Sequence, residues 1–311
     1  MLFSCSNKTP QNIGENSTES ISNRMDSFKS LLKPINAYYI AIINSDSVIK
    51  EIYDGKNANG EDFDKSTIME MASLSKTVFA SLYWQLSETN KVVFNPFYTL
   101  SDSNLYFPKS LLSHFGTDKN QENPHFEYSD LGYIALQKHL EKTQNNSLEN
   151  LVQHKIFEKA KMKNSSFIWQ NYSNYVNGYE AFKRQNQVIR QYNMPLANGT
   201  LYSNATDFTQ FVSYFLKQPF LDSMAIIRVK IENQKQLYWG AGMGIEKQKT
   251  NTYLWQWGNN WAYNHILIID IEKNLAFLAM SNSIVGAKQL RFFANKVFNT
   301  EFELFDFINW Y

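Results

Sequence analysis

Apolar residues near the start of the chain fall into two short runs. Residues 37–53, AYYIAIINSDSVIKEIY, are apolar on either side of a polar stretch at residues 44–47. Apolar runs around a turn of this kind predict a β-hairpin. Three more short, β-like runs come much later, at residues 252–257, 264–270 and 275–281, with a tight turn at 272–274 between the last two.

The middle of the chain shows a helical period instead. A stretch that opens at Ser73 spaces its apolar residues three and four apart, at Leu74, Val78, Phe79, Leu82, Tyr83 and Leu86. The same period predicts helices over residues 132–142, 148–160 and 286–298. Strands at both ends of the chain, with helices between them, predict an α+β fold whose sheet is built from both chain ends.

Composition narrows the class of protein. The chain has 311 residues, 43% of them hydrophobic, which is enough for a substantial core. Its 30 Lys and Arg residues balance 29 Asp and Glu residues, so nucleic acid is not an expected partner. The longest apolar runs are too short to span a bilayer.

The N-terminal segment contains the single cysteine, Cys5, so no internal disulfide is expected. Residues 2–5, LFSC, resemble the end of a bacterial lipoprotein signal, whose cysteine is acylated, and the polar segment up to residue 24 would suit a flexible tether. The charged start and apolar body of such a signal are missing. If the native product starts upstream of Met1, the protein is expected in the cell envelope or periplasm, lipid-anchored through Cys5. If Met1 is the native start, the protein is expected in the cytoplasm.

A serine and a lysine three residues apart are the first candidate for chemistry. This S-x-x-K pattern occurs three times, but only Ser73 and Lys76 open a long amphipathic helix, where residues three apart are neighbours. The positive end of the helix dipole favours an oxyanion on Ser73 and disfavours an ammonium on Lys76. A neutral lysine beside a serine can accept its proton. The alternative is a capping serine next to a lysine that reaches solvent.

Five further segments, in the right order, favour the catalytic interpretation. From ASLSKT at 72–77 onward, the chain resembles the serine β-lactamase and penicillin-binding protein superfamily, and most closely its class C-like branch with the related carboxylesterases. The resemblance covers most of residues 37–300. It is carried by AYYIAIINSDSVIKEIYDG (37–55), KSLLSHFG (109–116), FEYSDLGYIALQKHLEK (126–142), LANGTLYSNATDFTQF (196–211) and QWGNNWAYNHILIID (256–270).

The resemblance implies a fold and a set of roles. The fold is an antiparallel sheet flanked by helices with an inserted helical lobe. A single catalytic domain would occupy residues 25–311, with an α/β lobe at about 35–72 and 225–311 and the helical lobe at about 73–224. Ser73 would be the nucleophile, Lys76 would accept or relay its proton, and Tyr128 would protonate the leaving group. The N–H groups of Ser73 and of a residue near Asn259 would form the oxyanion hole, with no cofactor or metal.

Two departures from the family pattern bear on the substrate. Asp130 stands where the family has Asn; it cannot donate an amide hydrogen bond, and it could pair with Lys76 and keep it charged. The third motif, normally Lys or His, then Thr or Ser, then Gly, falls within Gln256, Trp257, Gly258 and Asn259 and has no cation. Its register is ambiguous by one residue.

These departures favour an ester hydrolase, because lactams and cell-wall peptides carry a carboxylate that the missing cation would hold. Three alternatives stay open: a β-lactamase, a D-alanyl-D-alanine peptidase, or a degenerate member that only binds cell-wall peptides. An arginine elsewhere, such as Arg184, Arg190 or Arg291, could replace the missing cation. His114 is expected to be a structural hydrogen-bonding residue, Asn198 and Gly199 to form a turn, and Asp207 to cap a helix.

Overall fold

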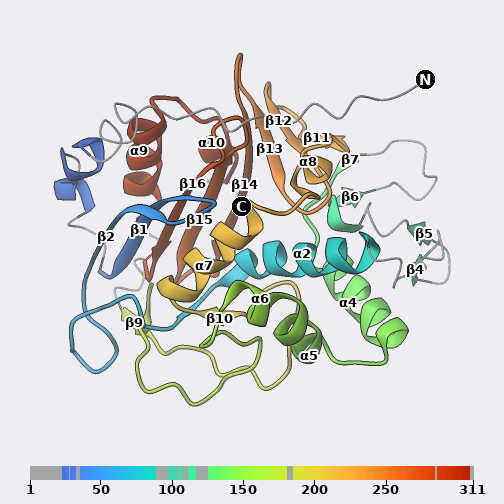
Figure 1. The fold of residues 1–311 in the computed structure, drawn as a ribbon, viewed down its shortest axis with the longest axis horizontal. Helices are drawn as coiled ribbons and strands as arrows, with labels where there is room; N and C mark the ends of the chain where they lie inside the picture. Colours follow the sequence, from blue (N-terminus) through green and yellow to red (C-terminus); the bar gives the residue numbers. More distant parts are fainter. Residues whose placement is uncertain are drawn as a thin grey trace.

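An eight-stranded antiparallel sheet forms the centre of the molecule (Figure 1). The computed structural model describes residues 23–27, 29–32, 36–88, 98–101, 104–106, 111–116, 125–180, 185–283 and 286–308. Cys5 and the predicted tether lie outside these residues, so both stay predictions, as does the division into two lobes. No helix among the described residues is long and apolar enough to cross a membrane.

The sheet joins the two ends of the chain, as the sequence predicts. Its strand order is β11-β12-β13-β14-β15-β16-β1-β2. Strand β1 pairs with β16 in a register that sets Tyr38 opposite Ser281, so blue and red strands lie side by side in Figure 1. The strands are β1 (Tyr38–Asn44), β2 (Val48–Asp54), β11 (Val229–Lys230), β12 (Leu237–Trp239), β13 (Gly244–Lys247), β14 (Thr252–Asn259), β15 (Asn264–Asp270) and β16 (Leu275–Ser281).

Both faces of the sheet are covered, which explains why its central strands are apolar throughout. Alternate residues of a strand point to opposite faces, and in β1 Tyr39 and Ala41 join one buried cluster while Ile40 and Ile42 join another. The first cluster includes α2 (Ser75–Glu88) and α7 (Ala205–Phe215), and the second includes α9 (Gly286–Phe298) and α10 (Leu304–Ile308). The predicted helix over 286–298 is therefore confirmed as α9.

Helix α2 runs through the buried centre of the helical part of the molecule (Figure 1). The apolar face predicted for this helix is confirmed, since all six residues predicted to form it, from Leu74 to Leu86, are buried. The other two predicted helices are also present, within α4 and in the run α5, η3, α6. Further helices are η1 (Lys29–Leu32), η2 (Ala72–Leu74), α4 (Asp130–Gln144), α5 (Leu148–Val152), the π-helical turn η3 (Gln153–Phe157), α6 (Glu158–Ala160) and α8 (Leu221–Met224).

Short two-stranded ladders tie the loops to this framework. The ladder that matters for the site pairs β3 with β10, setting Glu70 opposite Tyr202 immediately before Ser73. The short strands are β3 (Met69–Glu70), β4 (Tyr98–Ser101), β5 (Asn104–Tyr106), β6 (Phe115–Gly116), β7 (His125–Phe126), β8 (Gly178–Glu180), β9 (Gln185–Gln187) and β10 (Tyr202–Ser203).

The structure corrects two details of the predicted elements. Ser73 lies in the short 3₁₀ turn η2, and α2 proper begins at Ser75. Asp207 does not cap α7: the cap is Asn204, whose side chain accepts a hydrogen bond from the Asp207 N–H at 2.8 Å. The Asp207 carboxylate instead accepts from the Asn164 N–H at 2.6 Å. Asn198 lies in a turn, as predicted.

Candidate active site

Ser73 is held in a tight turn at the start of the central helix. The residue before it, Ala72, has a φ of 47°, in the left-handed region that costs a non-glycine residue strain energy. Ser75 braces this turn, because its hydroxyl donates to the Ala72 carbonyl and accepts from the Leu201 N–H at 3.1 Å. The Met71 N–H also donates to the Leu201 carbonyl, at 2.8 Å. The turn that bears Ser73 is therefore held in place by two hydrogen bonds to Leu201, the residue just before strand β10.

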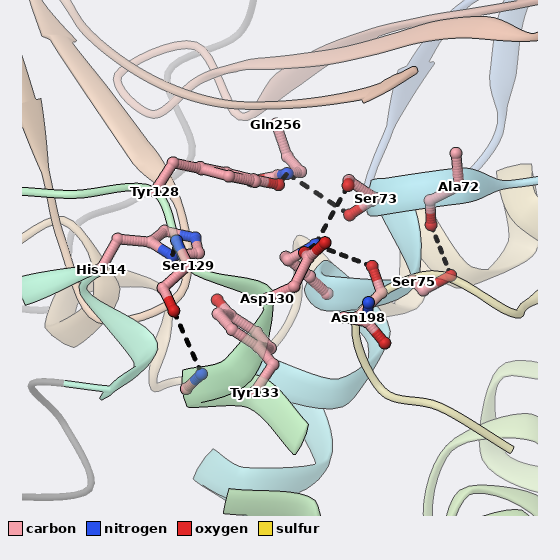
Figure 2. A network of polar contacts seen from close by, with 12 residues as sticks. Ala72, Ser73, Ser75, His114, Tyr128, Ser129, Asp130, Tyr133, Asn198 and Gln256 are labelled. Carbon is pink, nitrogen blue, oxygen red and sulfur yellow. Dashed lines mark hydrogen bonds and ion pairs between the residues drawn. The ribbon is translucent and has the colours of Figure 1, made fainter. Parts of the chain in front are cut away.

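Lys76 is fully buried and lies beside Ser73. Its Nζ is 3.0 Å from Ser73 Oγ, 2.7 Å from the Asn198 carbonyl oxygen and 2.6 Å from Asp130 Oδ1. A lysine ammonium group has three N–H groups, which match these three acceptors in number. The expected pairing of Asp130 with Lys76 is thus present. Figure 2 shows Ser73, Asp130 and Asn198 gathered around this point.

Asn198 is a site residue that the sequence did not reveal. Its backbone carbonyl reaches Lys76 because the loop before it is clamped to α4. Gln137 of α4 donates to the Pro195 carbonyl at 2.9 Å and accepts from the Ala197 N–H at 2.8 Å. Helix α4 therefore supplies Asp130 from its first turn and fixes the loop that bears Asn198. No sequence signal marks a carbonyl contact of this kind, since any residue can make it.

Tyr128 stands next to Lys76 and rests on aromatic neighbours. Lys76 Nζ is 5.0 Å from the centre of the Tyr128 ring, within range of a cation–π interaction. The His114 ring stacks on Tyr128 with centres 4.1 Å apart and planes 26° apart, and Trp257 packs 4.7 Å away. Gln256 Nε2 donates to the Tyr128 hydroxyl at 3.3 Å.

His114 is a buried structural residue, as expected. Its Nδ1 accepts a hydrogen bond from the Ser129 N–H at 2.9 Å, so Nδ1 carries no proton. Burial, together with the charge of Lys76, lowers the pKa of His114 well below its usual value. A neutral ring therefore supports Tyr128, and Figure 2 shows His114 linked to Ser129 at the start of α4.

Strand β14 turns the neighbouring residues Gln256 and Trp257 to different sides. Gln256 is completely buried and its Nε2 lies 3.3 Å from the Ser73 carbonyl oxygen as well as contacting Tyr128. Trp257 points to the opposite face, where it packs 5.9 Å from Phe307 of α10. Of these two residues, Gln256 is therefore the one that contacts the Ser73 carbonyl oxygen and the Tyr128 hydroxyl.

Gly258 allows β14 to pass close to the turn that holds Ser73. A Cβ at this position would lie 2.5 Å from the Met71 carbonyl oxygen and 3.2 Å from the Leu74 nitrogen. Contacts this short are not tolerated, so only glycine fits without a shift. The sequence predicted Gly258 as a site residue, and the structure shows the close approach that requires it.

The end of β14 is anchored by a buried carboxylate. Asn259 Oδ1 accepts from the Trp261 N–H at 2.8 Å, which closes the turn after the strand. Glu70 Oε2 accepts from Asn260 Nδ2 at 2.8 Å, and Glu70 Oε1 accepts from the Arg190 N–H at 2.6 Å. Burial raises the pKa of the Glu70 carboxyl group, although these hydrogen bonds oppose the rise.

The predicted site residues thus come together from three parts of the chain: η2 and α2, the start of α4, and the end of β14. Within the described ranges no group of three His, Cys, Asp or Glu side chains is placed to hold a metal ion. Of the three arginines that might replace the missing cation, Arg291 pairs with Asp306 in α10 and Arg184 lies outside the described residues. Arg190 lies near β14, where its guanidinium donates to the Asn260 carbonyl oxygen at 3.3 Å.

A family comparison agrees with this geometry. The family model described as Beta-lactamase matches residues 102–292, more than half of the chain. The chain belongs to the Beta-lactamase family. The match starts after Ser73 and Lys76 and includes Tyr128, Asp130 and the whole of β14. The chain is accordingly a serine hydrolase of this family, as the sequence predicts.

Solved structures of this family share the fold at low identity. A β-lactamase/D-alanine carboxypeptidase from Pseudomonas syringae is 12% identical, with a TM-score of 0.75 over 91% of this chain and 99% of that one. A class C β-lactamase from Rhodobacter sphaeroides is 11% identical, with a TM-score of 0.75 over 89% and 99%.

The hydrolase EstCE1, described as having promiscuous acyltransferase activity, is 14% identical, with a TM-score of 0.74 over 92% and 99% of the two chains. No curated protein matches the sequence. These likenesses confirm the predicted α+β fold, but enzymes of several specificities share it, so the substrate has to be argued from the site.

Proposed function

We propose that the chain hydrolyses carboxylic esters through an acyl-enzyme on Ser73. The proposal is supported by the buried side chain of Lys76, whose Nζ is 3.0 Å from Ser73 Oγ. Ser73 Oγ attacks the ester carbonyl carbon as its proton leaves, and the tetrahedral intermediate then expels the alcohol, which takes up that proton. Water hydrolyses the acyl-serine by the same route, returning the proton to Ser73 and releasing the acid.

Tyr128 is the group that we assign to the proton transfer. Lys76 is already surrounded by three acceptors, so its ammonium form has no lone pair with which to take a proton. The Tyr128 oxygen is the acceptor that we assign, because Lys76 Nζ lies beside the Tyr128 ring and Gln256 donates a hydrogen bond to the Tyr128 hydroxyl. Lys76 and Tyr128 then act as one unit in which the charge of one sets the proton affinity of the other.

The oxyanion hole is assigned to the N–H groups of Ser73 and Asn259. Gly258 supports this assignment, since it lets the end of β14 approach the Ser73 turn closely enough for two N–H groups to reach one oxygen. Donors fixed in this way stabilise the charge that develops on the carbonyl oxygen in the transition state. The Glu70 network holds the next residue, Asn260, and so supports the same strand end.

Gln256 is the observation that carries the preference for esters. We assign it to the position from which a Lys or His would hold a substrate carboxylate, and it is neutral and fully buried. A substrate carboxylate would thus lose a charge-assisted hydrogen bond worth about 1.5–3 kcal/mol, or roughly ten- to a hundredfold in kcat/KM. Asp130 adds repulsion, with 55% of its side chain exposed to solvent.

Arg190 favours a second candidate function, hydrolysis of β-lactams or D-alanyl-D-alanine peptides. Its guanidinium contacts the carbonyl oxygen of Asn260, one residue beyond β14. A rotation of this side chain toward the site would supply a cation for a carboxylate. A degenerate member that only binds cell-wall peptides is a third candidate, but the intact contact between Ser73 and Lys76 argues against it.

A paired assay separates these functions. The purified protein is tested with a neutral short-chain nitrophenyl ester and a chromogenic cephalosporin, alongside Ser73→Ala and Arg190→Gln. We expect Ser73-dependent ester hydrolysis, weak cephalosporin turnover and little effect of Arg190→Gln. Efficient cephalosporin turnover that is lost in Arg190→Gln would establish the second function instead. Fluorophosphonate labelling that is unchanged in Ser73→Ala would refute Ser73 as the nucleophile.

We further propose attachment to the cell envelope through a lipidated Cys5. The proposal is supported by the LFSC sequence and the polar segment that follows it. In the native host, partitioning into the Triton phase should depend on Cys5. A Cys5→Ser protein that partitions like the wild type, or a native protein that retains Met1, would refute it.

A further inference from the structure

The ion pair in the site presents its negative end to solvent. Lys76 has none of its side chain exposed, whereas Asp130, 2.6 Å away, has 55% exposed. An approaching substrate therefore meets the carboxylate first, with the ammonium behind it. At short range this arrangement attracts a cation and repels an anion, because the nearer charge dominates.

Two buried side-chain oxygens near the pair lack a hydrogen-bond donor within the described part of the chain. Gln256 is completely buried between the Tyr128 hydroxyl and the Ser73 carbonyl, yet its Oε1 has no partner within the described part of the chain. The buried Oδ1 of Asn198 has none there either. Asp130, which contacts Lys76 through Oδ1, has 55% of its side chain exposed and so can be reached by a substrate. A substrate group rich in N–H donors would satisfy these oxygens.

We infer that the substrates of this site carry a protonated amine next to the scissile carbonyl, and that Asp130 binds this amine. The inference rests on the ester hydrolysis proposed above and names its substrate class: aminoacyl esters or the corresponding amides. Asp130 Oδ1 and Ser73 Oγ contact the same Lys76 nitrogen, at 2.6 and 3.0 Å. An amine bound to the other Asp130 oxygen is then close enough to be one or two bonds from a carbonyl carbon on Ser73.

Arg190 fixes the side of the site on which the amine lies. Its guanidinium lies beside the end of β14, where its N–H groups donate to the Tyr192 hydroxyl at 3.0 Å and to the Asn260 carbonyl oxygen at 3.3 Å. An amine near Asn260 would be repelled by this guanidinium. At the start of α4, the basic side chain that contacts Asp130 among the described residues is the buried Lys76.

Three benzyl propanoates that differ only in the substituent at C2 test the inference. Benzyl alaninate carries NH₃⁺, benzyl isobutyrate carries CH₃ and monobenzyl methylmalonate carries COO⁻ at the same position. Release of benzyl alcohol is measured by chromatography at a pH where the alaninate amine is protonated, using both D- and L-alaninate. We expect kcat/KM for one alaninate to exceed that for the isobutyrate about tenfold or more, and the methylmalonate to be the poorest substrate.

Variants assign the preference to Asp130. Asp130→Asn should abolish the ratio of alaninate to isobutyrate, while Asp130→Glu should retain most of it. Glu127→Gln is the matched control, because it removes an exposed negative charge three residues away without touching Lys76. If Glu127→Gln changes the ratio as much as Asp130→Asn does, the effect is a general field and the inference is wrong.

A second readout covers variants that are too slow to assay. The inhibition constants of 1-aminoethylboronic acid and isopropylboronic acid report the same amine-for-methyl exchange without turnover. A wild-type preference for the aminoboronic acid that is lost in Asp130→Asn supports the inference. Ser73-dependent hydrolysis of all three esters without preference overturns the inference and leaves the proposed function standing. No Ser73-dependent hydrolysis of any ester overturns both.

Discussion

A methyl group added at Gly258 should separate the two halves of the proposed oxyanion hole. In Gly258→Ala, the new carbon would lie 2.5 Å from the Met71 carbonyl oxygen, which belongs to the backbone and cannot rotate away. Because carbon–oxygen contacts settle at about 3.3–3.6 Å, strand β14 and the Ser73 turn must move apart by roughly 0.8–1 Å.

The size of this shift sets the expected loss of activity. A misplacement of about 1 Å costs on the order of a hundredfold in rate, and loss of one oxyanion donor costs a similar factor or more. We therefore expect kcat/KM to fall about a hundredfold, equivalent to about 2.7 kcal/mol of transition-state stabilisation. Overpacking should also lower the free energy of unfolding by about 1–3 kcal/mol, which leaves the protein folded at room temperature.

Two measurements check the prediction without requiring the natural substrate. The first is the rate at which a fluorophosphonate labels Ser73, read by mass spectrometry, and the second is kcat/KM for a short-chain ester; a thermal melt verifies folding. Gly199→Ala is the control, since a Cβ there meets nothing within 4 Å. A Gly258→Ala protein that labels and turns over like the wild type would refute the reasoning, as would an equal loss in Gly199→Ala.

Three further predictions concern proton transfer by Lys76 and Tyr128, binding of a substrate carboxylate at Gln256, and the stability of the protein at acid pH. Removing Lys76 or Tyr128 should each lower kcat on the order of a thousandfold, with little more lost in the double variant; additive losses would argue against a shared role. Gln256→His should raise cephalosporin turnover about tenfold, whereas Trp257→Lys should not, because the Trp257 side chain is packed against the rings of Tyr128 and of Phe307 in α10. Burial lowers the pKa of His265 to about 4, below the usual value of about 6.5, so this neutral group contributes stability above pH 6.5 that is lost as the pH falls toward 4. Chemical denaturation should show about 3 kcal/mol of this loss, and less of it in His265→Gln.

The parts of the fold that the sequence predicted are those with a long, regular pattern. Strands β14 to β16 and helices α4 and α9 are long enough for their apolar residues to show a period. Strands β11 to β13 were missed, because two to four residues cannot show one. The cap of α7 was misplaced by three residues, since Asn204 and Asp207 are both good capping residues and only the backbone shows which one precedes the helix.

The site residues also divide into those that the sequence predicted and those that it could not predict. Ser73, Lys76 and Tyr128 were predicted because side-chain chemistry at fixed spacing leaves a trace in the sequence. The one-residue ambiguity at Gln256 was inevitable, because a slip of one residue exchanges the two faces of a strand and both neighbours suit a buried site. The contact of Asn198 with Lys76 uses a backbone carbonyl, which every residue has.

The pairing of β1 with β16 also governs how this chain is made. Strand β1 ends at Asn44, and its partner does not begin until Leu275. At about 5–20 residues per second, a ribosome needs roughly 10–50 s to make the chain between them. Throughout that time the apolar segment 38–44 has β2 on one edge and nothing on the other, an open edge that can pair with another nascent chain. The yield of folded protein therefore depends on how well this segment is kept apart from its neighbours until β16 is made.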